Sequence, residues 1–223
     1  FWGRIRANMG TTWGDYVRAL ASNARYLAKL GVNVSDIRDL LSFEVMQASG
    51  LGITRTLASA LDAQVQAPGL SIAFTRSFSA DIPSHFRLGR FGRGWSDNWE
   101  YSLATASDGT VTVFGPSGSC RIFQPDSRGA NYFSQPGDYA ALRSIGANMF
   151  ALQEAGGTLY TFSEGKLQSV QDPHTNRITC IYSGDQLTKL THSAGPWLEL
   201  TYTGARVTAM HDSVGRETAF AYD

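Results

Sequence analysis

The chain has 223 residues, of which 43% are hydrophobic and 12% aromatic, enough to bury the core of one large domain or two small ones. The 19 Lys and Arg residues balance 19 Asp and Glu residues, so the composition argues against a general binder of nucleic acid or of an anionic membrane. No apolar run reaches the roughly 18 residues of a membrane span, and two cysteines, Cys120 and Cys180, exclude a disulfide framework or a four-cysteine zinc site.

The first predicted element is an amphipathic helix over residues 13–30. Thr12 and Asp15 have the spacing of a capping box, in which each side chain binds a free backbone amide of the first turn. Gly31 supplies the residue type that commonly ends a helix. The apolar side chains recur with a helical period and share one face, at Trp13, Tyr16, Val17, Leu20, Ala24, Leu27 and Leu30.

Two further helices are predicted before the character of the sequence changes. One begins at Ser35, whose hydroxyl can accept a hydrogen bond from the first turn, and ends before Gly50. The other covers about residues 54–64. We therefore expect a helical N-terminal segment over residues 1–68.

A β-rich region is predicted to follow the turn at Pro68. Short aromatic and β-branched stretches are separated by Gly, Ser, Asp and Pro at strand-like intervals. The expected fold is mainly β with an α-helical N-terminal segment, divided into domains 1–68 and 69–223. The β region opens with apolar residues at alternate positions, Leu70, Ile72 and Phe74.

The C-terminal third of the chain repeats with a period of 20 residues. Turn residues recur at this spacing, with Asp172, His192 and Asp212 in one column. One aromatic column and one aliphatic column define the expected structural core of the repeat: Phe162, Tyr182, Tyr202 and Tyr222 in the first, and Leu167, Leu187 and Val207 in the second.

Each row of the repeat is predicted to be a β-hairpin. A lone hairpin is marginal because ordering its backbone costs about 1–2 kcal/mol per residue, whereas each buried apolar side chain returns only about 1.5–3 kcal/mol. The hairpins must therefore stack on their neighbours. The expected product is an extended curved sheet of stacked hairpins.

The β region resembles the Rhs/YD-repeat proteins. In that family a strand ending in Tyr-Asp is followed by a Gly-containing turn, a Leu-containing strand and a D-x-x-G-N/R turn. The matching segments here are 70–78 (LSIAFTRSF), 89–96 (GRFGRGWS), 108–111 (DGTV), 172–176 (DPHTN), 212–216 (DSVGR) and Tyr222-Asp223. The resemblance covers about residues 69–223.

Several positions depart from the family pattern. Ser163, Ser183 and Thr203 stand where the Asp of the Tyr-Asp pair would be. Thr175 replaces the turn glycine, and His192 replaces the turn aspartate.

The resemblance implies a wide sheet that spirals into a hollow β-shell, as in bacterial Rhs proteins, toxin-complex subunits and teneurins. Such a shell encloses a cargo, for example a toxin, or presents an interaction surface. Family members that have chemistry keep it in a separate C-terminal toxin or in an autoproteolytic region near the end of the shell. The resemblance also implies a secreted or cell-surface protein.

No catalytic, cofactor-binding or metal-ligating residue is predicted. The histidines, His85, His174, His192 and His211, lack any ligand spacing and are interpreted as solvated turn residues. His192 occupies the phase of the turn aspartates, so we expect its side chain to cap the turn. The sequence pair His211-Asp212 beside Ser213 does not establish a catalytic geometry.

The stretch 86–95 interleaves arginines with aromatic residues. This composition suits stacking on single-stranded bases. The preferred interpretation is a glycine-bent loop that plugs the start of the sheet, since the chain carries no net charge. The plugging side chains would be Phe91, Trp95 and Trp99.

Cysteine and tryptophan positions give the remaining expectations. Cys180 shares a strand face with Tyr182 and is read as a small buried hydrophobe, while Cys120 lies on the opposite phase, so both thiols are expected to be free.

Trp197 departs from its repeat column and should point away from the face of Leu198. It would stack on a sugar or, alternatively, cover the neighbouring hairpin.

The resulting hypothesis is a non-enzymatic structural part of a larger secreted or surface protein. The chain is expected to be an interior or processed piece, with an open strand edge near Asp223. Further repeats or a second chain would pair with that edge. The alternative is an extracellular adhesion or carbohydrate-binding module that uses the outer face of the sheet.

Overall fold

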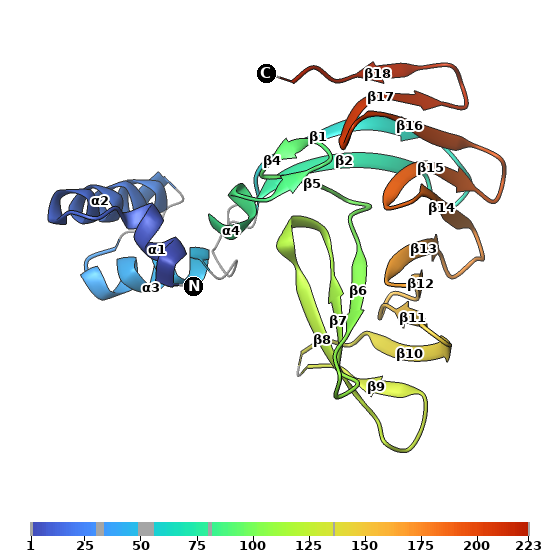
Figure 1. The fold of residues 1–223 in the computed structure, drawn as a ribbon, viewed down its shortest axis with the longest axis horizontal. Coiled ribbons are helices and arrows are strands. Elements are labelled where there is room, and N and C mark those ends of the chain that lie inside the picture. Colours follow the sequence, from blue (N-terminus) through green and yellow to red (C-terminus); the bar gives the residue numbers. More distant parts are fainter. Residues whose placement is uncertain (1, 30–33, 49–55, 80–81, 136, 223) are drawn as a thin grey trace.

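A computed structural model describes residues 2–29, 34–48, 56–79, 82–135 and 137–222. A group of helices precedes a large β region, so the fold is mainly β with a helical N-terminal segment, as predicted (Figure 1). The β region contains a 13-stranded sheet, a three-stranded sheet and a short two-stranded ribbon.

The helical segment contains α1 (Trp2–Met9), α2 (Trp13–Lys29) and α3 (Ile37–Ala48). The capping box at the start of α2 is confirmed, because the Asp15 amide donates to the Thr12 hydroxyl (3.2 Å) and the Thr12 amide donates to the Asp15 carboxylate (3.2 Å). A small core joins α1 to α2 through Ile5, Met9 and Leu20.

The predicted cap of α3 at Ser35 is wrong by one residue. The helix begins at Ile37, and the Asp36 carboxylate accepts a hydrogen bond of 2.8 Å from the amide of Arg38. Both residue types can cap a helix, so the sequence pattern alone does not choose between them. The predicted terminators Gly31 and Gly50 lie outside the described residues.

The helix predicted over residues 54–64 is also wrong. Residues Thr56–Val65 form strand β1, which pairs antiparallel with β2 (Ile72–Ser79). Leu57 and Leu61, which would share one face of a helix, are 50% and 59% exposed and do not build a core. Pairing with β2 overrides the local pattern, so the β region begins ahead of residue 68.

Two short pieces lie in the chain between β2 and the third strand of the three-stranded sheet. Strand β5 (Trp95–Asp97) pairs with β2 and completes the order β1-β2-β5. Before it come the single-turn helix α4 (Ile82–His85) and the ribbon of β3 (Leu88–Gly89) and β4 (Gly92–Arg93).

The 13-stranded sheet closes on itself over part of its width. Strands β6 to β13 follow one another in the sheet, and β13 pairs with both β12 and β6, which makes a closed ring of eight strands. These strands are β6 (Ser102–Thr105), β7 (Val111–Phe114), β8 (Cys120–Pro125), β9 (Asn131–Phe133), β10 (Ala141–Gly146), β11 (Met149–Gln153), β12 (Leu159–Ser163) and β13 (Lys166–Gln171).

The rest of the sheet extends from β13. It consists of β14 (Arg177–Ser183), β15 (Gln186–His192), β16 (Trp197–Thr203), β17 (Arg206–Asp212) and β18 (Glu217–Ala219). Neighbouring strands pair antiparallel in chain order. Figure 1 shows these strands, in orange to red, curving over β1 and β2.

The 20-residue rows correspond to the hairpins β12–β13, β14–β15 and β16–β17. Each hairpin has a register shift at the same place, just before the aromatic column at Phe162, Tyr182 or Tyr202. In the last two hairpins the extra residue is Thr188 or Thr208, whose hydroxyl donates back to a carbonyl of the paired strand. A recurring bulge bends each hairpin in the same way.

The main core lies between the three-stranded sheet and the 13-stranded sheet. Phe162, Leu167, Leu187 and Val207 are fully buried in it, and the aromatic residues Tyr182 and Tyr202 pack at its margin. Tyr222 is 37% exposed. The aromatic ring of Phe91 bridges the two sheets through edge contacts with Phe74 and Phe220, at 5.5 and 5.3 Å between centroids.

Candidate functional site

The rows are held together by hydrogen bonds that recur with the repeat. The Tyr202 phenol donates to the carbonyl oxygen of Leu187 (2.8 Å), and the Tyr222 phenol donates to that of Val207 (2.6 Å). Each bond runs from the aromatic column of one row to the aliphatic column of the row before it. Row-to-row contact is therefore polar as well as apolar.

A second recurring contact joins the hairpin turns. The Lys166 ammonium donates to the carbonyl oxygen of Gly184, and the Gln186 amide donates to that of Gly204, both at 2.7 Å. Sequence reasoning missed this column of long polar side chains. Its signal was present in the same 20-residue spacing, one position before the aliphatic column.

A recurring backbone bond also closes each hairpin at the other end of the row. The Ser193 amide donates to the carbonyl oxygen of Arg177 (2.8 Å), and the Ser213 amide donates to that of Trp197 (3.0 Å). Glu217 occupies the equivalent place in β18.

Strand β18 is the last strand in the sheet order. Among the described residues, β17 is the strand that pairs with it, and its other side has no strand partner. We call this side of Glu217–Ala219 the repeat edge. By the equivalence of the rows, it presents the backbone groups with which β16 pairs with β17, the returning strand of its own hairpin.

The turn residues behave as caps. The Asp172 carboxylate accepts hydrogen bonds from the amides of His174 (2.8 Å) and Asn176 (2.9 Å), and a bond from the Asn176 side chain lowers the pKa of Asp172. The His192 ring caps its own turn, because Nδ1 accepts a 3.0 Å hydrogen bond from the amide of Ala194. The predicted capping role of His192 is confirmed.

The prediction that His192 is solvated is wrong, because its side chain is 1% exposed. Nδ1 is used as an acceptor, and Nε2 is buried with no hydrogen-bond partner among the described residues. The row of His192 has Pro196 where the other rows have Asn176 or Arg216. Proline has no amide to donate, so a carboxylate at position 192 would keep the amide of Ala194 but lack the backbone and side-chain donors that Asn176 and Arg216 give to Asp172 and Asp212.

The other histidines are not brought together. His174 is exposed, His211 faces Glu217 at 3.8 Å, and His85 stacks on Phe78. No cluster of three or more His, Cys, Asp or Glu side chains that could hold a metal ion occurs within the described residues.

The arginine-rich loop packs against the core with its apolar side chains, as the preferred interpretation predicted, while Phe86 and Leu88 are exposed. Phe91 and Trp99 are buried at 3% and 7% exposure, and Trp95 packs beside them. Arg90 forms a paired contact with the fully buried Asp97, at 2.6 and 3.0 Å. Burial alone would lower the pKa of Arg90, but the Asp97 carboxylate raises it.

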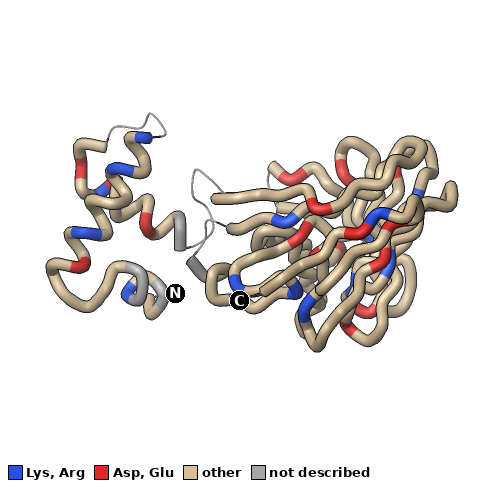
Figure 2. Tube along the Cα trace, turned by 90° about the horizontal axis from the view of Figure 1, so that it is seen from above, with Lys and Arg blue, Asp and Glu red and all other residues tan. Residues whose placement is uncertain are grey.

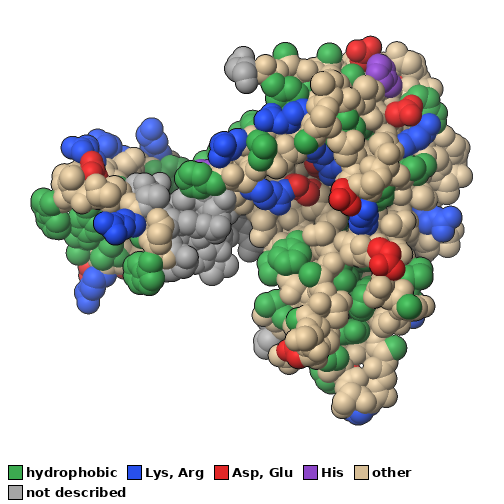
Figure 3. Space-filling view, viewed as in Figure 1, with side chains coloured by type: hydrophobic (Ala, Val, Ile, Leu, Met, Phe, Trp, Pro, Cys, Tyr) green, Lys and Arg blue, Asp and Glu red, His purple; other side chains and the backbone are tan. Residues whose placement is uncertain are grey.

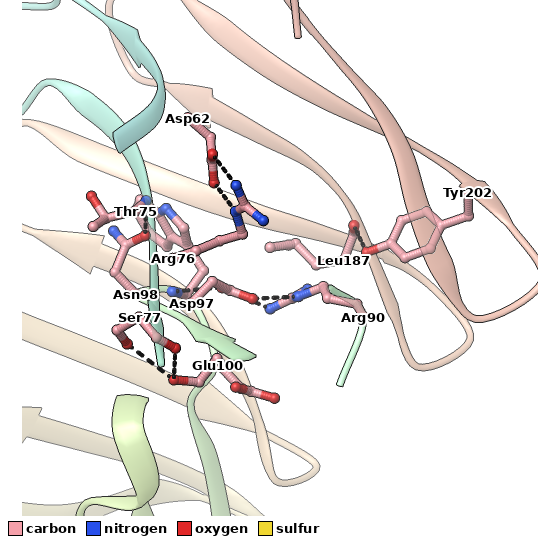
Figure 4. Close-up of polar contacts among 12 residues, drawn as sticks. Asp62, Thr75, Arg76, Ser77, Arg90, Asp97, Asn98, Glu100, Leu187 and Tyr202 are labelled. Carbon is pink, nitrogen blue, oxygen red and sulfur yellow. Dashed lines mark hydrogen bonds and ion pairs between the residues drawn. The ribbon is translucent and has the colours of Figure 1, made fainter. Parts of the chain in front are cut away.

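A second buried ion pair lies beside the first (Figure 4). Arg76 binds Asp62 with its Nε (2.6 Å) and Nη2 (2.8 Å), and its guanidinium lies over the rings of Phe91, Trp95 and Phe220. These arginines are occupied by carboxylates and rings. Figure 2 shows basic and acidic residues interspersed along the β region, with no stripe of one sign.

Trp197 lies where the sequence pattern placed it. It is partly buried on the phase opposite the buried Leu198, and the Lys189 ammonium sits 4.3 Å from its ring centroid. Lys189 belongs to the preceding hairpin, so one ring face is already in contact with a neighbouring row. This contact favours the interpretation that Trp197 covers the neighbouring hairpin.

The two thiols are free and differ in environment. Cys180 is buried in the main core, and burial raises the pKa of its thiol to about 12. Cys120 is exposed on β8.

Comparison with known proteins gives one partial match. A family described as a domain of unknown function (DUF6531) matches residues 54–123, which include β1, the arginine-rich loop and β6 to β8 up to Phe123. No curated protein matches the sequence. In the part of the chain that the structure describes, no helix is long and apolar enough to cross a membrane.

Proposed function

We propose that the chain is a non-enzymatic structural part of a larger Rhs/YD-repeat protein and builds the start of a β-shell. The observation that carries this proposal is the set of two row-to-row contacts that recur with the 20-residue period. Contacts that repeat in this way allow rows to be added one after another. The resemblance of the β region to that family supports the same reading.

The proposed partners are segments that could pair with the repeat edge. A further row of the same polypeptide, or a strand of a second chain, would pair with β18. The completed shell would enclose a cargo such as a toxin or present an interaction surface. The proposed location, secreted or at the cell surface, rests on the family resemblance.

The proposal is tested by appending one more row. A copy of residues 204–223 is fused after Asp223, and a control carries the same copy with its two apolar columns changed to serine. The copied row should pair with β18, so the free energy of unfolding should rise and the amides of Glu217–Ala219 should exchange more slowly with solvent.

Two results would contradict the proposal. One is a copied row that remains unprotected in hydrogen exchange. The other is a control row that protects β18 as well as the copy does, since pairing would then not depend on the repeat columns. The alternative of a sugar-binding module centred on Trp197 has less support, because Lys189 lies over that ring.

A further inference from the structure

A groove of about 430 Å³ lies where the hairpin turns meet the loop that carries Arg90. Its volume is within the roughly 300–1,000 Å³ of small-ligand sites. Three tyrosines contribute to its wall, Tyr101, Tyr182 and Tyr202, together with Trp99. We call it the tyrosine groove.

The charged side chains around the tyrosine groove are already paired. Arg90 binds Asp97 at 2.6 Å, Lys166 binds Asp185 at 2.7 Å, and Arg87 binds Glu100. The groove therefore offers no surplus charge of either sign. Figure 3 shows the same mixture on the visible face of the β region, where acidic and basic side chains are interspersed. A charged ligand would have to compete with an existing ion pair.

Two polar atoms at the groove remain available. The Tyr182 phenol makes no hydrogen bond within the described residues, in contrast to the phenol of Tyr202. The Gln186 amide donates through its nitrogen to Gly204 and leaves its oxygen as an acceptor.

We infer that the tyrosine groove binds a neutral saccharide. A pyranose ring has an apolar face that packs on aromatic rings and hydroxyls that both donate and accept. The rings of Tyr101 and Tyr202 supply the first surface, since the Lys166 ammonium lies over the ring of Tyr182. The Tyr182 phenol and the Gln186 amide oxygen supply the partners for the hydroxyls. This inference goes beyond the proposed structural function and involves a surface separate from the repeat edge.

The test uses the whole chain and a panel of neutral oligosaccharides. Maltohexaose, cellohexaose and chitohexaose are titrated by calorimetry and by saturation-transfer NMR, with a heparin hexasaccharide as the anionic comparison. Tyr182→Phe removes only a hydroxyl and should weaken binding of a neutral sugar about tenfold. Gln186→Ala should weaken it by a similar factor. Trp197→Phe, at a position outside the groove, should leave the affinity unchanged.

Three results would overturn the inference: no binding of any neutral oligosaccharide at millimolar concentration, preferred binding of heparin, or a loss of affinity in Trp197→Phe but not in Tyr182→Phe. Circular dichroism of each variant confirms that its fold is intact. The repeat edge is unaltered in these variants, so failure here leaves the row-addition experiment unaffected.

Discussion

The phenol of Tyr202 and the carbonyl oxygen of Leu187 are joined by a 2.8 Å hydrogen bond that connects two rows of the sheet. Tyr202→Phe removes the donor and leaves a partly buried carbonyl without this partner. We expect the free energy of unfolding to fall by about 1 kcal/mol. Urea denaturation followed by tryptophan fluorescence measures the change.

Tyr139→Phe is the matched control for Tyr202→Phe. Tyr139 is 84% exposed, so loss of its hydroxyl should leave stability unchanged. Equal effects in the two variants would show that the bond to Leu187 contributes nothing to the packing of the rows.

A second prediction concerns closure of the ring at Gly165. This residue has φ of +75°, its carbonyl oxygen accepts a 2.8 Å bond from the amide of Leu103, and a Cβ would lie 2.8 Å from the Leu103 carbonyl oxygen. Gly165→Ala should therefore cost more than the roughly 1–3 kcal/mol of a strained backbone alone. Thermal unfolding gives the measurement.

Gly184→Ala separates the cost of backbone strain from the cost of the Cβ clash with the Leu103 carbonyl oxygen. Gly184 also has positive φ, +58°, but a Cβ there meets nothing within 4 Å. It should show the backbone penalty without the clash. If both variants lose the same stability, the contact of β6 with β13 is not tight at this point.

The third prediction concerns the turn at His192. His192→Asp places a carboxylate in a position that is 1% exposed, opposite Pro196, which cannot donate an amide. The expected loss is about 1–3 kcal/mol, from a buried carboxylate that keeps the amide of Ala194 but lacks any donor at position 196. Adding Pro196→Asn restores the partners seen at Asp172 and should recover most of the loss. A double variant no more stable than the single one would rule out this explanation.

The fourth prediction is loss of stability in alkaline solution. Burial raises the pKa of the Tyr182 phenol and of the Tyr101 phenol above the ordinary value. The folded chain holds these protons more tightly than the unfolded chain, in which tyrosine ionises near pH 10. The stabilisation is therefore complete below about pH 10 and is lost as the pH rises through the raised pKa values.

Melting temperatures measured between about pH 9 and 11.5 test this expectation. The Tyr101→Phe/Tyr182→Phe variant should show a shallower decline above pH 10 than the original chain. Identical slopes in the two proteins would assign the alkaline loss to other groups.

The rows were predictable from sequence because each is a local hairpin. The period of 20 residues places Leu187 and Val207 at equivalent points, and both are fully buried. The capping roles of Thr12 and His192 were also local and were correctly predicted. In each case the partners are a few residues apart, so the pattern contains the whole interaction.

Ring closure and β1 were not predictable in this way. The ring depends on pairing of Ser102 with Lys166, two residues far apart in the chain with no shared pattern. Strand β1 is fixed by its pairing with β2, whereas its own spacing of leucines resembles a helix. Long-range partners decided both elements.

The candidate site was predictable only in part. The aromatic column was predicted to be core. The hydrogen bonds of its phenols were missed, because residue spacing does not show where a hydroxyl group points. The plugging role of the loop was predicted, but the pairing of Arg90 with Asp97 was not, because it depends on how the loop returns to β5.

Strand β13 pairs with three others, β12, β14 and β6. If the chain is pulled from the side of β18, the outer strands must break their antiparallel pairing and also the bonds of Val207 to Arg90 and of Thr218 to Asp62. Strand β13 must in addition break its pairing with two strands of the ring. We therefore expect the force needed for separation to rise when unfolding reaches β13.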